Sequence, residues 1–123
     1  MDINTISYDV IGCAYRVHSG LGPGLLESAY RVCLSHELAA MGYEVDQERI
    51  LPVNYKGIQL NAGYRIDIVV ANLVLVEIKA VHSIHPNHIA QTLTYLRLSG
   101  MELGLLLNFN ERNLQNGIRR LRL

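Results

Sequence analysis

No stretch of the sequence is apolar for long enough to cross a bilayer, because runs such as Leu103 to Leu107 fall far short of the roughly 20 residues required. The N-terminus lacks the basic start and apolar core of a secretory signal. Only two cysteines occur, Cys13 and Cys33, both at apolar positions of predicted helices, and two thiols do not make a disulfide framework. We therefore expect a cytoplasmic protein with buried, reduced cysteines and no membrane contact.

An excess of charge of either sign is also missing, because 11 basic residues balance 11 acidic ones. Zero net charge argues against a domain that holds nucleic acid by broad electrostatic attraction alone. The densest basic cluster is Arg119, Arg120 and Arg122 near the C-terminus. A solvated strand face or a charged sheet edge would explain this cluster without any ligand.

Half of the 123 residues are hydrophobic and no segment is of low complexity, which indicates a single packed domain spanning residues 1–123. A chain of this length buries roughly two thirds of its unfolded surface. Neither an internal repeat nor a linker divides it. Short glycine- and proline-containing turns separate segments of regular hydrophobic period instead.

Apolar residues three and four apart predict a first helix carrying Ile3, Ile6, Val10, Cys13 and Val17. The loop 20–24 ends it, a second helix is expected from Leu25 to Met41, and Pro86 suits the start of a third that ends at Ser99 before Gly100. Strand patterns cover Tyr43 to Tyr55, Leu73 to Ala80, Leu103 to Phe109 and Gly117 to Leu123. Two further extended segments, Ile58 to Leu60 and Tyr64 to Val70, lie on either side of Asn61-Ala62-Gly63. The order ααβββαββ predicts an α/β fold with a mixed sheet flanked by helices.

Two charged side chains interrupt the apolar strand Leu73 to Ala80. Because side chains alternate along a strand, Glu77 and Lys79 point to the same side. On the preceding strand the alternation places Ile66, Ile68 and Val70 on one face and Arg65, Asp67 and Val69 on the other. A buried carboxylate needs a partner, and a metal ion shared with Asp67 would provide one for Glu77.

This shared site requires a particular turn between the two strands. A plain two-residue loop at Ala71-Asn72 would pair residue 67 with 76 and put Asp67 and Glu77 on opposite faces. A three-residue loop, Val70-Ala71-Asn72, pairs 69 with 73 and 67 with 75, and all odd-numbered residues then share a face. Asn72 favours this bulged turn because asparagine tolerates the left-handed conformation. A flush two-residue hairpin would exclude the site.

Two further polar residues occupy helical positions near this site. Glu27 begins a stripe through Tyr30, Leu34, Leu38 and Met41 and is therefore expected to point inward, although a glutamate in a first turn is also favoured by the helix dipole alone. Gln91 and Tyr95 lie four apart on the third helix and are expected near Lys79. A buried Gln–Tyr pair on a packing face would explain them equally well.

The histidines and the glycine loop invite other interpretations. His82, His85 and His88 recur every third residue, but Pro86 interrupts them, so a polar loop is favoured over a zinc site. His18 closes the first helix, where a cation suits the dipole. The loop 20–24 could receive a phosphate through backbone N–H groups, but it lacks the Lys-Ser/Thr of a P-loop.

Several of these residues form a recognisable set of motifs, with Gly24, Glu27 and Tyr30 followed by Tyr64-Arg65-Ile66-Asp67, Val76-Glu77-Ile78-Lys79-Ala80 and Gln91-Thr92-Leu93-Thr94-Tyr95-Leu96. The set resembles the GxxExxY proteins, a compact branch of the PD-(D/E)xK nuclease superfamily, from the first helix to the last strand. The proline of the superfamily name is replaced here by Ile66. The resemblance implies a restriction-endonuclease-like core with a four-stranded mixed sheet, and a site where the Asp67 and Glu77 strands diverge.

The resemblance also implies a role for each matched residue. Asp67, Glu77 and the Ile78 carbonyl would bind Mg²⁺ or Mn²⁺, which prefer oxygen ligands. Lys79 and Gln91 would assist catalysis, and Glu27 would contact the metal directly or through water. Residues expected near the substrate are Tyr30, Arg65, His88 and Tyr95.

The leading hypothesis is thus a metal-dependent nuclease or nuclease-like phosphodiesterase, acting on DNA rather than RNA. The alternative is a non-catalytic accessory protein that binds nucleic acid or a nucleotide and keeps the nuclease fold. Zero net charge favours the accessory protein, whereas the intact set of Glu27, Asp67, Glu77, Lys79 and Gln91 favours the enzyme. A homodimer, or a partner subunit that supplies a basic surface, would reconcile the two.

Overall fold

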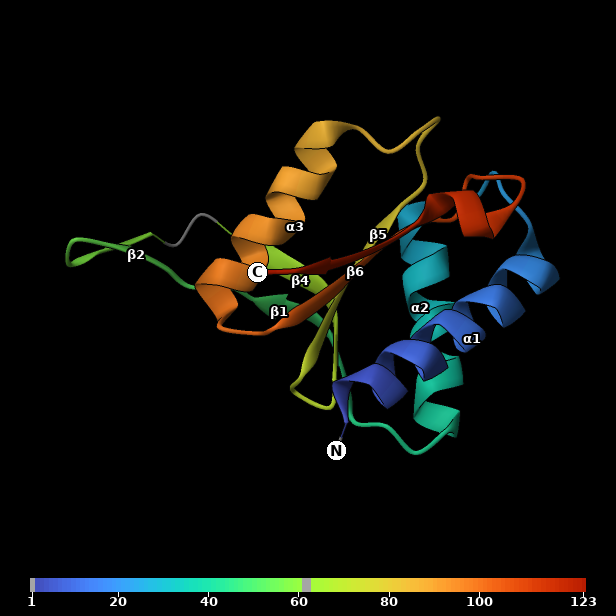
Figure 1. The fold of residues 1–123 in the computed structure, drawn as a ribbon, viewed down its shortest axis with the longest axis horizontal. Coiled ribbons are helices and arrows are strands. Elements are labelled where there is room, and N and C mark those ends of the chain that lie inside the picture. Colours follow the sequence, from blue (N-terminus) through green and yellow to red (C-terminus); the bar gives the residue numbers. More distant parts are fainter. Residues whose placement is uncertain (1, 61–62) are drawn as a thin grey trace.

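The computed structural model of the chain describes residues 2–60 and 63–123. It contains three α-helices, α1 (Ile3–Leu21), α2 (Glu27–Ala40) and α3 (Pro86–Ser99). The strands are β1 (Val45–Ile50), β2 (Val53–Tyr55), β3 (Ile58–Leu60), β4 (Arg65–Val70), β5 (Val74–Lys79), β6 (Leu103–Asn108) and β7 (Ile118–Arg122), with a short 3-10 helix at Leu114–Gly117. Figure 1 shows their arrangement.

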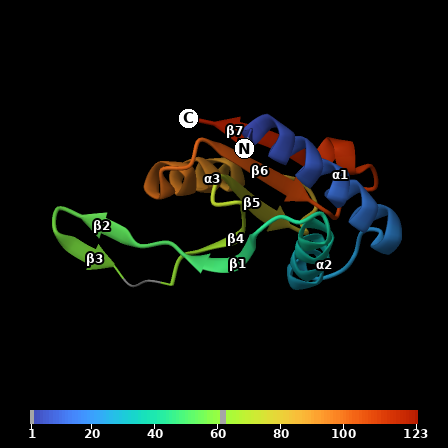
Figure 2. The same ribbon diagram turned by 90° about the horizontal axis from the view of Figure 1, so that it is seen from below.

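A five-stranded sheet in the order β1-β4-β5-β6-β7 forms the centre of the domain. Only β5 and β6 run parallel, because α3 crosses between them, and the other neighbours are antiparallel. Helices α1 and α2 lie against one face and α3 against the other (Figures 1 and 2). The predicted α/β fold and mixed sheet are confirmed, and the helices and main-sheet strands follow the order ααβββαββ. The sheet has five strands, one more than the four-stranded sheet that the resemblance implied.

The helices follow their predicted periods. In α1 the stripe Ile6, Val10, Cys13 and Val17 is buried, and the N-cap Asp2 accepts a hydrogen bond from the Asn4 N–H at 3.0 Å. The helix continues past Gly20 and ends at Gly22, whose φ of 69° favours glycine. Helix α3 spans the predicted residues and ends at Gly100, which is left-handed. It lies close to β6, where a Cβ on Gly104 would meet Leu96 side-chain atoms at 3.3 Å.

The stretch expected as one strand from Tyr43 to Tyr55 is divided in two. Strand β1 ends at Ile50, and β2 pairs only with β3 in a separate two-stranded sheet. Pro52, between them, has no N–H with which to continue the main ladder. The β2–β3 hairpin turns at Lys56 and Gly57, both of positive φ, and projects away from the body (Figures 1 and 2). Asn61 and Ala62, expected beside it, lie outside the described residues.

Between β4 and β5 the structure corrects the predicted register. Val70 pairs with Val74 and Ile68 with Val76, so the three-residue loop is Ala71-Asn72-Leu73 rather than Val70-Ala71-Asn72. Ala71 and Asn72 both have positive φ, at 54° and 58°. Because the loop has three residues either way, odd-numbered residues of β4 still stand opposite odd-numbered residues of β5. The register is displaced by two residues, and its continuation places Asp67 opposite Glu77.

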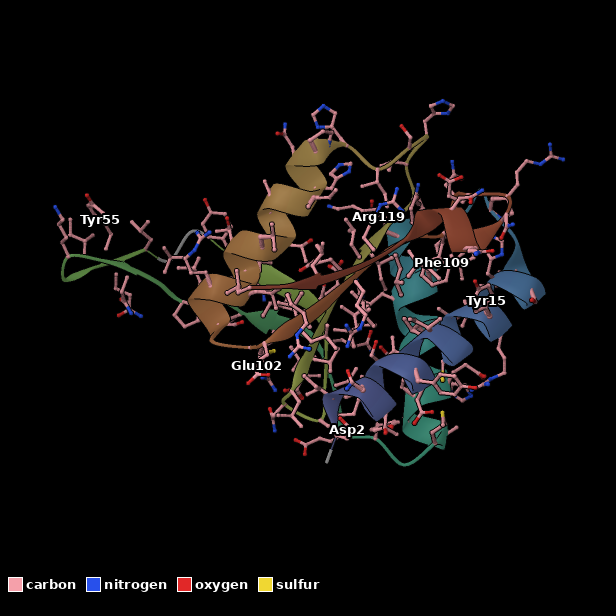
Figure 3. All side chains as sticks on the ribbon, in the orientation of Figure 1. Asp2, Tyr15, Tyr55, Glu102, Phe109 and Arg119 are labelled. Carbon is pink, nitrogen blue, oxygen red and sulfur yellow. The ribbon has the colours of Figure 1, made fainter. Side chains whose placement is uncertain are left out.

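The arginine cluster lies on β7, which is an edge strand of the sheet. The Arg120 guanidinium donates to Asn4 Oδ1 at 2.6 Å, and that of Arg122 lies 3.5 Å from Glu102 Oε2. Figure 3 shows Arg119 and Glu102 toward different ends of this edge. The interpretation as a charged sheet edge therefore agrees with the structure. Both cysteines are free, but only Cys13 is buried and Cys33 is half-buried, contrary to the expectation for it.

Within the described residues, no helix combines the length and the apolar character that crossing a membrane requires.

Candidate metal centre

Asp67 and Glu77 meet where the two central strands separate. The β4–β5 ladder runs from Val70 and Val74 to Ile68 and Val76 and goes no further, although both strands continue. Beyond it, Asp67 Oδ2 accepts a hydrogen bond from the Ile78 N–H at 2.7 Å. A side-chain oxygen thus replaces the backbone carbonyl that a regular ladder would supply. The Asp67 carboxylate also lies near enough to Glu77 for its charge to act on that side chain.

The backbone around Asp67 is distorted on its other side as well. Strand β1 pairs Gln47 with Ile68 and Arg49 with Ile66, but no pair joins Glu48 to Asp67, and Glu48 has a φ of 52°. As a result the predicted alternation fails: Ile66 packs in the cluster beneath α3 together with Val69, whereas Ile68 packs toward α1 and α2. Ile66 was expected on the other face. The irregularity lies beside the acidic pair.

Glu77 is the most unusual carboxyl group of the domain. Its side chain is 3% exposed, and Oε1 has no hydrogen-bond partner. Burial, followed by the negative charge of Asp67, raises the pKa of Glu77 to about 9. An unpartnered buried carboxylate costs several kcal/mol, and a divalent cation would offset this cost. The donor set of Asp67, Glu77 and the Ile78 carbonyl therefore fits a hard cation such as Mg²⁺ or Mn²⁺.

Lys79, two residues after Glu77, connects the end of β5 to helix α3. Its Nζ lies 3.4 Å from Gln91 Oε1, and the Gln91 amide donates to the Tyr95 hydroxyl at 3.4 Å. Tyr95 is 8% exposed, and burial together with the charges of Glu77 and Asp67 raises its pKa. Gln91 itself is exposed, so the interpretation as a buried Gln–Tyr packing pair is wrong. The structure instead joins Lys79, Gln91 and Tyr95 in one polar chain.

Glu27 lies at the end of β5 but does not join the acidic pair. It is exposed rather than inward-facing, because it occupies the first position of α2, and Met41 at the far end of its stripe is also exposed. Glu27 Oε2 accepts a hydrogen bond from the Ala80 N–H at 3.3 Å. Across residues 2–60 and 63–123, no three His, Cys, Asp or Glu side chains are grouped closely enough to hold a metal. Direct ligation by Glu27 is thus absent from this conformation.

Tyr30 supports the loop before α2. Its ring is fully buried and stacks on Phe109, with centroids 4.6 Å apart and an interplanar angle of 8°. Its hydroxyl donates to the Gly22 carbonyl at 2.6 Å and accepts from the Leu25 N–H at 3.1 Å. Figure 3 shows Phe109 inside the domain. The expected contact between Tyr30 and substrate is therefore wrong, since no part of the side chain reaches the surface.

The glycine loop offers little to a phosphate, because its N–H groups already have partners. Gly24 N–H donates to Asn110 Oδ1 at 3.1 Å, Leu25 N–H to Tyr30, and Gly22 N–H to the His18 carbonyl. The His18 ring, in the last part of α1, lies 2.7 Å from the Glu111 carbonyl oxygen. His18 thus joins the end of α1 to the loop after β6, which goes beyond the expected interaction with the helix dipole.

Two of the three later histidines form the start of α3. His85 is the N-cap and accepts from the Asn87 N–H, while His88 Nδ1 accepts from the His85 N–H, each at 3.0 Å. His82 is exposed before them. His88 is half-buried, and burial followed by the charge of Lys79 lowers its pKa. The polar-loop interpretation agrees with this arrangement, and His88 lies close enough to Lys79 and Glu27 to sense their charges.

Asn108 was missed by sequence reasoning. It is fully buried at the end of β6, opposite Lys79, and exchanges two hydrogen bonds with the Val81 backbone, at 3.0 and 2.9 Å. The Phe109 N–H also donates to the Lys79 carbonyl at 2.9 Å. These bonds fix the chain just after Glu77 and Lys79. An asparagine that ends a run of leucines was the available signal.

Taken with the fold, this site defines a class: an α/β domain with two acidic residues and a lysine where central strands part. Residues 4–121 match the sequence profile of the PD-(D/E)XK nuclease superfamily. The match covers nearly the whole chain, and the chain belongs to this superfamily. No curated protein and no solved structure shows significant similarity to it.

Proposed function

We propose that the protein is a Mg²⁺- or Mn²⁺-dependent phosphodiesterase that hydrolyses nucleic acid, with DNA as the preferred substrate, in the GxxExxY branch of its superfamily. One observation carries the proposal: the buried Glu77 Oε1 has no partner although the Asp67 charge acts on the same side chain, and Lys79 lies two residues further along the strand. Superfamily membership supports it. A purely structural role would not require a carboxyl group in so costly a position.

A cation held by Asp67, Glu77 and the Ile78 carbonyl would polarise a phosphoryl oxygen and make a water molecule more acidic. The chain's own residues would do the rest. Lys79, positioned by Gln91, places a positive charge next to the acidic pair, where it orients the attacking water or stabilises charge developing on phosphorus. Glu27 holds the backbone beyond Lys79 in place through the Ala80 N–H. Arg65, exposed at the start of β4, and His88 contact the substrate backbone.

A non-catalytic accessory protein is the second candidate, and the neutral charge of the chain favours it. A nucleic-acid-binding domain without excess positive charge gains little from counterion release. A second copy or a basic partner subunit would remove this objection to catalysis. Cleavage assays on the isolated chain therefore decide between the candidates only when binding is measured in parallel.

The test is cleavage of single- and double-stranded DNA and RNA with Mg²⁺ or Mn²⁺, compared among wild type, Lys79→Ala and Asp67→Asn. We expect each variant to lose about 100-fold or more in rate, because each removes a charge that acts in the transition state. Glu102→Gln, an exposed change at the other end of the sheet, is the control and should retain full activity. Equal residual activity in all four proteins would identify a contaminant and defeat the enzyme assignment.

A further inference from the structure

A pocket of about 300 Å³ lies between the projecting β2–β3 hairpin and helix α3. The hairpin supplies Val53 and Leu60, and Tyr64 comes from the segment just before β4. Helix α3 supplies Gln91, Tyr95 and Leu98, which are spaced four and three apart and so share one helical face. We call this the Tyr64–Tyr95 pocket.

The pocket is continuous with the candidate metal centre, because Gln91 and Tyr95 belong to both. Gln91 Oε1 lies 3.4 Å from Lys79 Nζ, and its amide donates to the Tyr95 hydroxyl. Tyr95 also lies near enough to Glu77 and Asp67 for their charges to act on it. A polymeric phosphodiester that placed one phosphate at the acidic pair would therefore bring the group next to that phosphate to the mouth of this pocket.

The lining of the pocket suits a flat aromatic group. The Tyr64 and Tyr95 rings meet edge to face, with centroids 6.5 Å apart and an interplanar angle of 69°. Tyr64 is 45% exposed and Leu98 40% exposed, so an aromatic and an apolar surface both remain open to solvent. Gln91 and Thr94 add hydrogen-bonding groups beside them. Such a mixture of ring surface and few polar groups is typical of sites that receive a nucleobase.

The charge of the molecule points in the same direction. With zero net charge, the chain gains little binding energy from phosphates, and the hairpin near the pocket offers only Lys56 beside the exposed Tyr55 (Figure 3). Stacking of bases on aromatic rings supplies affinity that does not depend on net charge. In a duplex, however, the bases stack on one another and present only their edges.

We propose that the Tyr64–Tyr95 pocket receives one unstacked nucleobase of a single-stranded nucleic acid, which would make single strands the substrate class. The inference rests on the proposed function, because the phosphate beside that base is the one placed at Asp67 and Glu77. Tyr64 provides the stacking surface, and Gln91 couples the occupied pocket to Lys79. A duplex enters this site only where a base leaves the stack.

The test measures the affinity of labelled oligodeoxynucleotides in EDTA, where cleavage does not interfere. The probes are a single strand, the duplex of the same sequence, and a strand of equal length that carries abasic sites throughout. We expect Tyr64→Ala to weaken binding of the intact single strand about 5- to 150-fold, the range for losing one stacked base. Tyr64→Trp should retain the affinity, and Tyr8→Ala, a change at an exposed tyrosine of α1, should have no effect.

The abasic strand provides the decisive comparison, because it keeps the phosphates and lacks the bases. Its weaker binding should not change with Tyr64→Ala. Equal loss on the intact and abasic strands, or duplex binding as tight as single-strand binding, would overturn the proposal. So would a wild-type dimer in sedimentation that Tyr64→Ala dissociates, because a second copy would then cover the pocket.

The outcomes also separate this proposal from the proposed nuclease activity. Cleavage that depends on Lys79, combined with binding that ignores Tyr64, would refute the pocket and leave the nuclease standing. Binding that depends on Tyr64 and on bases, without any cleavage dependent on Lys79, would support the pocket and refute the enzyme.

Discussion

Single side chains replace missing backbone hydrogen bonds at the end of the sheet that holds the candidate site. Asp67 bonds to the Ile78 N–H where the β4–β5 ladder stops, and Asn108 bonds to both backbone groups of Val81 where β5 has ended. Each such residue satisfies a backbone group that would otherwise remain buried without a partner. The strands can therefore separate and leave room for a ligand without losing the hydrogen bonds that hold their ends.

Tyr43 provides a test at the residue scale that is independent of the metal centre. Its hydroxyl donates to Asp9 Oδ2, joining the loop after α2 to α1. This hydrogen bond, followed by burial, raises the pKa of Tyr43 to about 12. Since the unfolded pKa is about 10, the contribution to stability is complete below pH 10 and is lost as the pH rises toward 12.

We expect Tyr43→Phe to lower the free energy of unfolding by about 1 kcal/mol below pH 10, with the difference from wild type shrinking between pH 10 and 12. Urea unfolding at a series of pH values measures this difference, and ionisation of the other tyrosines and lysines affects both proteins alike. Tyr8→Phe, at a 78% exposed position, is the matched control and should show no difference. A gap between Tyr43→Phe and wild type that stays constant up to pH 12 would contradict the assignment.

At the scale of elements, the helices were predicted best because their period and their end signals agree. Pro86 and Gly100 delimit α3 as expected, and the stripe of α1 is buried as expected. Ile58 to Leu60 was expected as an extended segment and forms β3, but its pairing with β2 in a separate hairpin was missed, because strands of three mostly exposed residues show no period. Pro52 was the local signal that the main ladder ends there.

The β4–β5 turn shows why its length could be predicted but its register could not. Asn72 was expected in the left-handed region and is found there, but Ala71 adopts it too, at a φ of 54°. Nothing in the intrinsic preference of alanine predicts this conformation. Tertiary contacts impose it, since the Ala71 N–H donates to the Glu44 carbonyl at 2.8 Å and the side chain packs against the core.

Ala71→Gly should therefore stabilise the protein, by about 0.5 kcal/mol, because glycine removes the left-handed strain at the expense of a freer unfolded chain and some lost packing. The same substitution at Ala90, an exposed position inside α3, should destabilise by about 1 kcal/mol. Chemical unfolding of both variants measures whether each substitution raises or lowers the free energy of unfolding. Destabilisation of equal size at both positions would show that Ala71 is not strained in solution.

The candidate site was predictable only in part. The alternation of side chains brought Glu77 and Lys79 to one side and suggested Asp67 as their neighbour, and the structure places all three at the end of the central strands. Glu27 was placed wrongly, because the helical spacing of apolar residues does not show whether the first residue of the stripe still lies within the core. Tyr30 stacks on Phe109 and Asn108 bonds to the Val81 backbone, and such contacts between residues distant in sequence follow only from the tertiary fold.

At the scale of the whole molecule, the candidate metal centre lies in the middle of the cooperative unit. Its proposed ligands come from β4 and β5, which lie between the core cluster facing α1 and α2 and the one beneath α3. The unfolded chain would scatter these ligands, so a cation that binds them binds only the folded state. Binding should therefore raise the stability of the entire domain rather than of one loop.

Thermal unfolding with increasing Mn²⁺ tests this coupling without any assay of activity. At a free Mn²⁺ concentration 100 times the dissociation constant, the gain is about 2.7 kcal/mol, or roughly 10 °C in the midpoint. Glu77→Gln should abolish the shift yet leave the metal-free protein at least as stable as wild type, because a neutral amide replaces a buried carboxyl group whose Oε1 has no partner. Asp67→Asn should also abolish the shift, whereas Glu48→Gln, at an exposed carboxylate of β1, should retain it. If the Glu77→Gln protein kept the wild-type Mn²⁺ shift, the cation would bind elsewhere, and the buried carboxyl group would need another explanation.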